Sequence, residues 1–481
     1  MKKSAIHESI FTERFKNTRI RKCILQKGMY FVKSQSLNFY TIFNKRYLFI
    51  FTFLIGITLM SCVNSSNIFN KDKWVYEERI NPSDNALGLL EKNGFLKVAV
   101  AQPKIHYSAE SFGTALLPAI TAAKKSIFII MFVANSNEFT KEIFEALIKK
   151  ADEGVAVYFL FDGTSYQRIF DNPSWSEEIV APSKIFNGTK VHWAEFNPLR
   201  AERVIALPQL LIRDHRKLVM IDGFHIFTGG YNINIYSFAP LDKNGNVDAM
   251  IEFMSYEAGQ YLTADFVNVW NKWSAFQIKK EMINPNHEIV SNQSEEKAIA
   301  MWLGNQDLAL SKKSLINTLY QIFFQYSYSE IWLIQALSVI TSAQMKMIQD
   351  AINRGVKVNL MLSEDQFSSS MDKAAKYMVL PLLDAGASVY IYKSDGNALL
   401  HYKLIMADKK LAALGSPNFN LRSMYLSNEI VLVFKEEIII NSVVKNLESL
   451  MANVREISKE EASQWRGLSY LMSYLVSIPG G

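Results

Sequence analysis

HRKLVMIDGFHIFTGGYN (residues 215–232) and HYKLIMADKKLAALGSPN (residues 401–418) are two copies of one pattern. They agree at a histidine, a lysine two residues later, an aspartate five residues after that, and a downstream glycine and asparagine, with identical spacing. With the residue frequencies of this chain, a chance second copy has a probability on the order of 10⁻⁴. The chain therefore contains two related units.

Each copy predicts a β-hairpin. The apolar residues Leu218–Ile221 continue a strand on which His215 and Lys217 project from one face, because side chains alternate along a strand. Asp222-Gly223 is typical of a hairpin turn, and Phe224–Thr228 is expected to return as the partner strand. In the second copy Asp408 and Lys409 stand at the same turn.

A lysine beside a histidine suits a phosphate anion, since the ammonium group neutralises the oxygens while the imidazole attacks or transfers a proton. Two such pairs facing each other would place a nucleophile and a general acid on opposite sides of one phosphorus. The remaining histidines singled out, expected to be structural or exposed, are His106, His192, His225 and His287. The sequence has no HExxH or CxxC motif, so neither a metal site nor a cofactor is expected.

A strand–helix–strand pattern precedes each copy of the motif. Apolar runs predict strands, and apolar residues at helical spacing predict the helices, which end at Gly154 and Gly355. The predicted elements are Ser126–Val133, Asn137–Ala151 and Val155–Gly163 in the first unit, and Glu330–Leu337, Ala343–Asn353 and Val356–Leu362 in the second. Such βαβ units give parallel strand pairs. We therefore expect two homologous halves, 96–290 and 291–481, after a polar linker over 62–95.

The two HxKxxxxD motifs, each with its downstream Gly and Asn, make the chain resemble the phospholipase D superfamily, and its cardiolipin-synthase-like branch in particular. The resemblance runs from about Lys124 to the end of the chain, including the apolar tail over Trp465–Pro479. Its stretch Leu468–Ile478 is apolar enough to touch a membrane, but packing on the second half is favoured. It implies an α/β fold of two α-β-α sandwich halves, with mixed, largely parallel sheets related by a pseudo-twofold axis.

The same resemblance implies the roles of the site residues. His215 would attack phosphorus to give a phosphohistidine and His401 would protonate the leaving alcohol, although the reverse assignment stays open. Lys217 and Lys403 would hold the phosphate oxygens, and the motif aspartates complete the catalytic set, although their place at turns favours a role in holding the loop. The supporting residues expected around the phosphate are Asn232, Asn418 and Ser416, the last of which is replaced by Gly230 in the first copy.

Each imidazole needs a partner that fixes its tautomer, and a downstream acid is the natural candidate. Glu429 follows the second motif and is assigned to His401. Asp248 is assigned to His215, with Glu252 as its competitor.

The N-terminal region resembles a bacterial lipoprotein signal. Residues 1–61 form a presequence in which an uncharged run over Tyr47–Met60 follows Lys45 and Arg46, and Cys62 stands where a lipidated cysteine is expected. The alternatives are an uncleaved membrane anchor and a coincidental cysteine. Residues 1–28 are unusual before a signal, which favours an over-extended start over a cytoplasmic tail. The prediction is a protein anchored in the cell envelope, outside the cytoplasm.

The overall composition limits the functions that fit. A chain of 481 residues that is 49% hydrophobic and has 2 cysteines is neither disordered nor disulfide-stapled. Residues 1–61 hold 11 of the 52 Lys and Arg residues and 2 of the 46 Asp and Glu residues, so the rest of the chain has a net charge of −3. This charge disfavours nucleic acid as a partner.

We therefore expect metal-independent phosphodiester hydrolysis or phosphatidyl transfer on phospholipids at a membrane, with water or an alcohol as acceptor. One chain carries both motifs, so an oligomer is not required. Two alternatives stay open: a nuclease with the same machinery, and a non-catalytic surface lipoprotein that keeps the fold.

Overall fold

The computed structural model describes residues 82–166, 179–198, 211–279, 298–308, 314–336, 338–364, 369–393 and 398–478. The presequence with its apolar run, Cys62 and the boundary expected at 290/291 lie outside these residues. Residues 79–481 belong to one compact unit. Within the described part of the chain, no helix combines the length and apolarity needed to cross a membrane.

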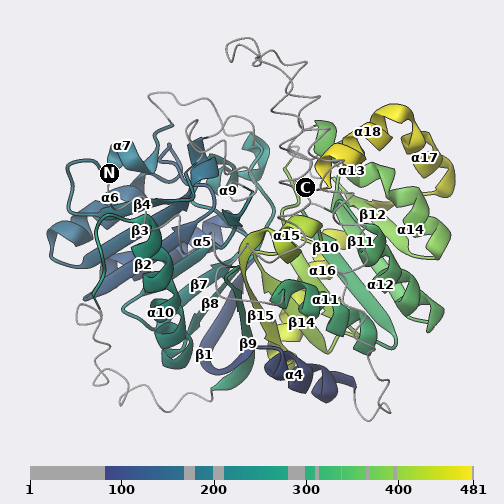
Figure 1. The fold of residues 1–481 in the computed structure, drawn as a ribbon, viewed down its shortest axis with the longest axis horizontal. Coiled ribbons are helices and arrows are strands. Elements are labelled where there is room, and N and C mark those ends of the chain that lie inside the picture. Colours follow the sequence, from purple (N-terminus) through teal and green to yellow (C-terminus); the bar gives the residue numbers. More distant parts are fainter. Residues whose placement is uncertain are drawn as a thin grey trace, which may run out of the picture. The chain divides into compact units, whose positions relative to one another are not determined.

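One continuous sheet joins the two halves, which Figure 1 shows side by side. Its two central strands, β1 (Leu96–His106) and β9 (Ile299–Gln306), are antiparallel and belong to different halves. Outward from β1 the order is β8 (Met250–Met254), β7 (His225–Gly229), β6 (Leu218–Ile221), β2 (Ser126–Met131), β3 (Ala156–Asp162) and β4 (His192–Phe196). Outward from β9 it is β15 (Ser427–Phe434), β14 (Leu411–Gly415), β13 (Lys403–Ala407), β10 (Glu330–Gln335), β11 (Lys357–Ser363), β12 (Ser388–Tyr392) and β16 (Val454–Glu456). The matching orders confirm the predicted repeat.

The expectation of largely parallel sheets is wrong. Parallel pairing occurs along β2–β3–β4 and β10–β11–β12, where helices connect the strands as the βαβ pattern predicts. All pairs from β2 inward to β1 and from β10 inward to β9 are antiparallel. Each motif forms a hairpin, β6–β7 or β13–β14, and a hairpin can join only antiparallel strands, which accounts for one of these pairs in each half.

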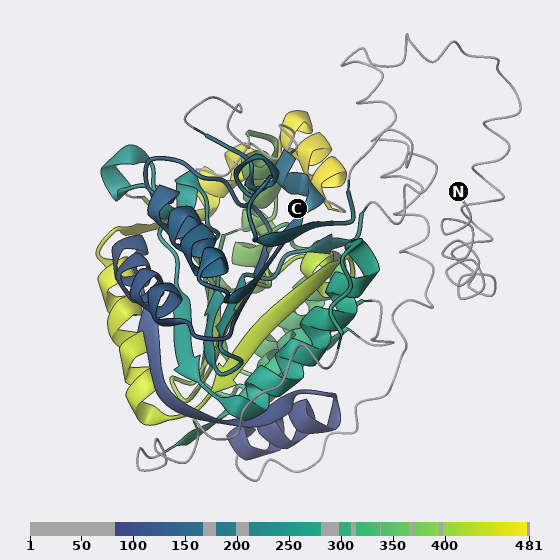
Figure 2. The ribbon, with the colours of Figure 1, turned by 90° about the vertical axis from the view of Figure 1, so that its left-hand side faces the viewer.

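Helices cover both faces of the sheet. In the first half, Phe128 and Ile130 of β2 belong to a core shared with the second half, whereas Ile127 and Ile129 face a separate core. The shared core is closed by α10 (Tyr256–Trp273) and α16 (Glu437–Met451), and the separate core by α5 (Ala109–Ala122) and α6 (Lys141–Asp152). Figure 2 faces this half, with α5 and α6 on one side of the strands and α10 on the other. The second half has its own outer core under α11 (Leu315–Tyr326), α12 (Ser342–Asn353) and α14 (Val379–Ala385). These layers confirm the α-β-α prediction.

The polar linker expected over 62–95 is corrected at its end. Residues Pro82–Lys92 form helix α4, and Ala86, Leu87 and Leu90 are buried in the outer core of the second half. Their spacing places them on one face of the helix, which explains the burial. The helix stops predicted at Gly154 and Gly355 are confirmed, with φ of +95° and +87°.

The remaining elements are short or terminal. The apolar tail packs on the second half as predicted: α18 (Leu468–Ser477) contacts α13 (Ser369–Tyr377), and the Tyr474 hydroxyl donates to the Ile340 carbonyl at 2.9 Å. The other helices and the strand off the main order are α7 (Pro182–Ile185), α9 (Ile235–Phe238), α15 (Leu421–Tyr425), α17 (Lys459–Ser463) and β5 (Arg213–Asp214). Short 3₁₀ turns cover Gly163–Tyr166, Leu241–Lys243 and Gln464–Arg466.

Candidate active site

The segment in front of each motif histidine pairs with the opposite half. β5 lies parallel to the start of β15, and the His215 N–H donates to the Asn428 carbonyl at 3.0 Å. In the second copy the His401 N–H donates to the Val247 carbonyl at 2.7 Å, and the Val247 N–H donates to the Leu399 carbonyl at 2.9 Å. Each histidine therefore lies beside the segment that carries the acid of the other half, Glu429 in β15 or Asp248 just before β8.

This pairing reverses the predicted acid partners. The Nδ1 of His215 lies 3.1 Å from both carboxylate oxygens of Glu429. The Nδ1 of His401 lies 2.5 Å from a carboxylate oxygen of Asp248. Both acids were identified correctly, but the assignments of Glu429 to His401 and of Asp248 to His215 are wrong, because the pairs form across the pseudo-twofold axis.

The competitor Glu252 belongs to another cluster. One of its oxygens lies 2.8 Å from Nε2 of His106 and the other 2.8 Å from Nε2 of His225. Burial alone would raise the pKa of Glu252, but the two histidine hydrogen bonds outweigh it and lower the pKa to about 2. The predicted structural role of His106 and His225 agrees with these contacts.

Both motif lysines are buried and point along their own segments. The Lys217 Nζ donates to the His215 carbonyl at 2.7 Å, and the Lys403 Nζ donates to the His401 carbonyl. Burial, and then the charge of Lys403, lowers the pKa of Lys217. Burial likewise lowers the pKa of Lys403 to about 8. Two neighbouring buried ammonium groups make this site favourable for an anion.

The electrostatics of the histidines also join the two copies. Burial lowers the pKa of His215 to about 4, and both Lys217 and Lys403 contribute in the same direction. Burial and Lys403 lower the pKa of His401 to about 3, and Lys217 again contributes. The lysine of each half thus lowers the pKa of the histidine in the other half, as expected if the two histidine–lysine pairs lie close together. Both imidazoles are neutral at pH 7 in the absence of an anion.

Phe132, directly after β2, was not predicted as a site residue. Its ring meets the imidazole of His215 edge-on, with 4.7 Å between centroids, and the Lys217 Nζ lies 5.1 Å from the ring centre. The register of β2 with β6 and of β10 with β13 makes Ala336 its equivalent in the second half. The available signal was an aromatic residue at the end of a buried strand, a pattern that is more often core.

Arg216, inside the first motif, was also missed. It is fully buried and binds Asp214 with Nη2 at 2.6 Å, Asp265 through Nη1, and the Asn305 side-chain oxygen at 3.1 Å. The arginine therefore fixes the segment between β5 and β6 that carries His215. The second copy has Tyr402 here, whose hydroxyl accepts from Asn446 at 3.0 Å.

The glycine and serine after each hairpin fit the acid of their own half. A Cβ at Gly230 would lie 2.1 Å from an Asp248 oxygen, so only glycine leaves room for that carboxylate. At the equivalent position the Ser416 hydroxyl donates to Glu429 and accepts from the Ile430 N–H. Ser416 thus holds the acid partner of His215, which fits the supporting role predicted for it.

Asn232 and Asn418 occupy equivalent places after β7 and β14. The side-chain oxygen of Asn232 accepts from the Val133 N–H at 3.1 Å, which leaves the amide NH₂ as the group able to donate to a phosphate. The backbone N–H groups of both asparagines donate to serine hydroxyls, Ser237 and Ser423. The short helices α9 and α15 therefore anchor the two asparagines.

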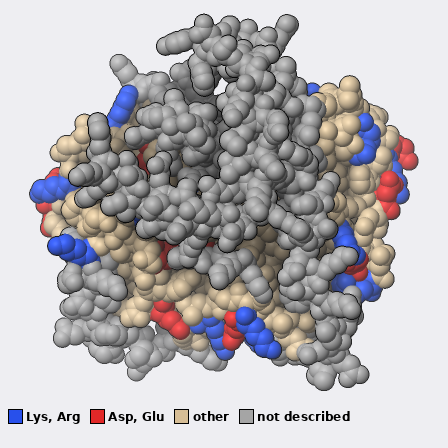
Figure 3. Space-filling model, in the orientation of Figure 1, with Lys and Arg blue, Asp and Glu red and all other residues tan. Residues whose placement is uncertain are grey.

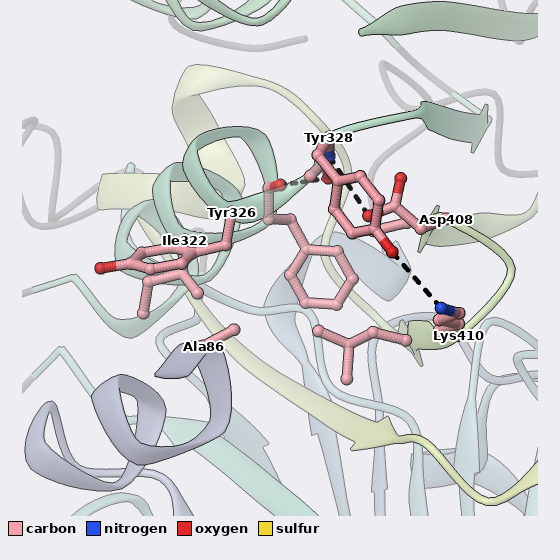
Figure 4. A pocket seen from close by; sticks show the side chains of 10 residues that line it. Ala86, Ile322, Tyr326, Tyr328, Asp408 and Lys410 are labelled. Atoms are coloured by element: carbon pink, nitrogen blue, oxygen red, sulfur yellow. Dashed lines mark hydrogen bonds between the residues drawn. The ribbon is translucent and has the colours of Figure 1, made fainter. Parts of the chain in front are cut away.

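The motif aspartates lie outside the catalytic group. The Asp222 carboxylate accepts from the N–H groups of Lys124, Lys125 and Ser126. Asp408 accepts from those of Tyr328, Ser329 and Glu330, and Figure 4 shows it at a small pocket of about 30 Å³ beside Tyr328 and Lys410. Both have left-handed backbones, with φ of 52° and 55°. These contacts agree with the predicted role in holding the hairpin turns, about 16 Å along the strand from the lysines, and favour that role over a place in the catalytic set.

Comparison with known proteins agrees with this geometry. The family model described as "Cardiolipin synthase, PLD-like domain" matches residues 116–270 and 323–451. Cardiolipin synthase 1 of Bacillus anthracis is 25% identical over 455 residues, covering 86% of this chain and 83% of that protein. Cardiolipin synthase 1 of Bacillus cereus is 26% identical over 353 residues, covering 71% of this chain and 65% of that protein.

A solved structure supports the fold. Phosphatidylserine synthase of Haemophilus influenzae has a TM-score of 0.59 at 13% identity, covering 81% of this chain and 94% of that one. Together with a family model that matches more than half of the sequence, the duplicated motif and the crossed histidine–acid pairs show that the chain belongs to the cardiolipin-synthase-like branch of the phospholipase D superfamily.

Proposed function

We propose that this protein transfers the phosphatidyl group of a phospholipid to the hydroxyl of a second phospholipid, through a phosphohistidine on His215. The observation that carries the proposal is the pair of crossed dyads, His215–Glu429 and His401–Asp248, beside two buried lysines. The relatives named cardiolipin synthase support a phospholipid as substrate.

In the first step Nε2 of His215 attacks phosphorus, and the bond from phosphorus to the leaving alcohol oxygen breaks. His401 gives its proton to that oxygen. Lys217 and Lys403 stabilise the extra negative charge on the phosphoryl oxygens, the largest contribution expected in such a site. In the second step His401 removes the proton of the acceptor hydroxyl, whose oxygen attacks phosphorus as the bond to His215 breaks.

The negative charge of the bound phosphodiester allows His401 to carry the proton that it gives to the leaving alcohol. His401 is neutral in the empty site because of burial and the nearby lysines. A bound phosphodiester places a negative charge beside it, which raises its pKa and favours the protonated form. His215 stays neutral and nucleophilic, with Glu429 holding the proton on Nδ1.

Hydrolysis and transfer share the phosphohistidine and differ in the acceptor. A nuclease would use the same chemistry on nucleic acid. The net charge of −3 after residue 61 weighs against nucleic acid. On the face in Figure 3, the basic and acidic side chains of described residues are interspersed. A non-catalytic surface protein would have no need for both buried lysines and both dyads.

The test is mass analysis of lipid products from the purified full chain with phosphatidylglycerol vesicles, with and without EDTA, beside a reaction with single-stranded DNA. We expect cardiolipin and glycerol, no effect of EDTA, and no DNA cleavage. His215→Asn and His401→Asn should each lower the rate at least 10³-fold while thermal unfolding stays unchanged. Substantial activity in either variant would refute the two-histidine scheme, and DNA cleavage without lipid products would favour the nuclease.

Anchoring at Cys62 forms the second part of the proposal. A lipidated cysteine would hold the enzyme at the bilayer surface of the cell envelope, where its substrate is concentrated. Cys62→Ser should release the protein from membranes while its specific activity in detergent stays the same. A variant that remains in the membrane fraction would contradict the lipoprotein assignment.

A further inference from the structure

Arg213 is a buried cation whose hydrogen-bonding capacity is only partly used. It is 1% exposed, and its Nη1 lies 3.2 Å from a carboxylate oxygen of Asp162 and 3.0 Å from the Asn197 carbonyl. Its Nε and Nη2 are buried without a hydrogen-bond partner among the described residues. Leaving buried charged donors unsatisfied is costly, so these two groups call for an acceptor.

A second arginine lies close to it. The Arg213 N–H donates to the Leu426 carbonyl at 3.0 Å, and the Leu426 N–H donates to the Arg422 carbonyl at 2.7 Å, which closes α15. Burial, and then the charge of Arg213, lowers the pKa of Arg422 to about 10, with Asp162 and Glu429 opposing. Two buried guanidinium groups whose positive charges repel each other favour the binding of an anion between or beside them.

This arginine pair breaks the pseudo-twofold symmetry of the site. Counting from the motif histidines, the equivalent of Arg213 is Leu399, and counting from the motif asparagines, the equivalent of Arg422 is Tyr236. The histidines, lysines and asparagines are duplicated, whereas Arg213, its ion-pair partner Asp162 and Arg422 have no charged counterpart at the equivalent positions of the other half. The two sides of the reacting phosphorus are therefore built for different groups.

The arginine pair is close enough to the nucleophile for one ligand to span both. Arg213 and His215 belong to one extended segment that follows the edge of β15 and are two residues apart, about 7 Å along the backbone. Side chains two apart project from the same side. A molecule with a phosphate a few bonds from its reacting hydroxyl, such as a glycerophospholipid, matches this arrangement.

We propose that Arg213 and Arg422 bind the phosphodiester anion of the acceptor phospholipid while its free hydroxyl attacks the phosphohistidine. The inference rests on the proposed function and names the acceptor within it. Guanidinium groups bind phosphate in a bidentate manner, which suits an anion that must be oriented as well as attracted. The subsite favours a phospholipid acceptor over water, and so favours transfer over hydrolysis.

The test measures how one intermediate partitions. Phosphatidylglycerol vesicles containing ethanol are given to the full-length protein, and cardiolipin, phosphatidylethanol and phosphatidic acid are quantified together. All three arise from the same phosphohistidine, so their ratios do not depend on the folded fraction or on the rate of the first step. Ethanol reports on a hydroxyl acceptor that carries no charge.

We expect Arg422→Gln and Arg213→Gln to lower the cardiolipin to phosphatidic acid ratio at least tenfold, the effect of one charge-assisted hydrogen bond. The phosphatidylethanol to phosphatidic acid ratio should stay within threefold, and Arg422→Lys should recover part of the cardiolipin ratio. Arg455→Gln, an exposed arginine bound to Glu461 at 2.7 Å, is the matched control and should change neither ratio.

Two results would overturn the inference while leaving the proposed function intact: an unchanged cardiolipin ratio in both glutamine variants, or an equal fall in the two ratios. Wild-type protein that yields phosphatidic acid alone would contradict the transfer reaction itself and the acceptor subsite with it.

Discussion

His215 and Glu429 are 214 residues apart and come from different halves, yet Nδ1 of the imidazole lies 3.1 Å from both carboxylate oxygens. The reciprocal pair, His401 and Asp248, repeats this relationship over 153 residues. Neither half therefore contains a complete dyad, although the motif, hairpin and acid are all present in each. Catalytic competence depends on the pairing of β5 with β15 and of Val247 with Leu400, which brings the halves together.

The crossed dyads predict opposite kinetic defects for the two acids. With a p-nitrophenyl phosphodiester, whose leaving group needs no proton, Glu429→Gln should slow the nitrophenol burst at least 10²-fold because it disturbs the nucleophile. Asp248→Asn should leave that burst within about threefold but slow the reaction of a phospholipid, whose alkoxide must be protonated. Stopped-flow absorbance separates these cases, and the reverse pattern would make His401 the nucleophile.

Glu252→Gln is the matched control for the acids. Glu252 binds His106 and His225 and contacts neither motif histidine in the described structure. The burst should keep its wild-type rate, while the midpoint of thermal unfolding falls because two partly buried histidine hydrogen bonds are weakened.

Gly230 and Ser416 should respond unequally to exchange. Gly230→Ala would place a methyl group within 2.1 Å of an Asp248 oxygen and push that carboxylate away from His401. We expect a loss of at least 10²-fold in kcat on phospholipid. Ser416→Gly removes one hydrogen bond to Glu429 and should cost about tenfold. Equal and small losses would show that the fit of each acid to its neighbour is unimportant.

Asp222→Asn and Asp408→Asn test whether the motif aspartates act on the fold alone. Each carboxylate accepts from three consecutive backbone N–H groups, so each amide should lower the free energy of unfolding by about 1–3 kcal/mol. Activity per folded molecule, with denaturation followed by circular dichroism, should stay within threefold of wild type. A 10²-fold loss of kcat with unchanged stability would restore these residues to the catalytic set.

Local features of the fold were predictable because spacing along the chain encodes them. The strand–helix–strand units, the glycine stops and the hairpin turns at Asp222 and Asp408 depend on neighbouring residues, and they agree with the structure. The dominance of antiparallel pairs was missed, although the two predicted hairpins already implied one antiparallel pair in each half. A helical connection shows only that the strands it joins are parallel.

The errors at the site have a different origin. Glu429 and Asp248 were chosen correctly by type, but sequence order suggested that each serves the nearer histidine. The pairing of each histidine with the acid of the other half depends on contacts between distant segments. The spacing of apolar residues along the chain does not report such contacts. Arg216 and Phe132 carry no pattern of their own, and their roles follow only from burial and from the rings and charges around them.

The buried lysine Lys403 should lower the free energy of unfolding at neutral pH when no anion is bound. The pKa of Lys403 is about 8 in the folded chain, against 10.5 for an unperturbed lysine. Between these values the unfolded chain binds the proton that the folded chain lacks, so stability rises with pH across this window and is lower at neutral pH. Lys403→Met should therefore raise the unfolding temperature at pH 7 while lowering activity at least 10³-fold. Inorganic phosphate should stabilise the wild type and not this variant.

In the wild type, kcat/KM should fall above about pH 8, because Lys403 loses the positive charge that attracts the substrate. A lower unfolding temperature for Lys403→Met at pH 7, or a kcat/KM that is flat to pH 10, would contradict the lowered pKa that burial gives to Lys403.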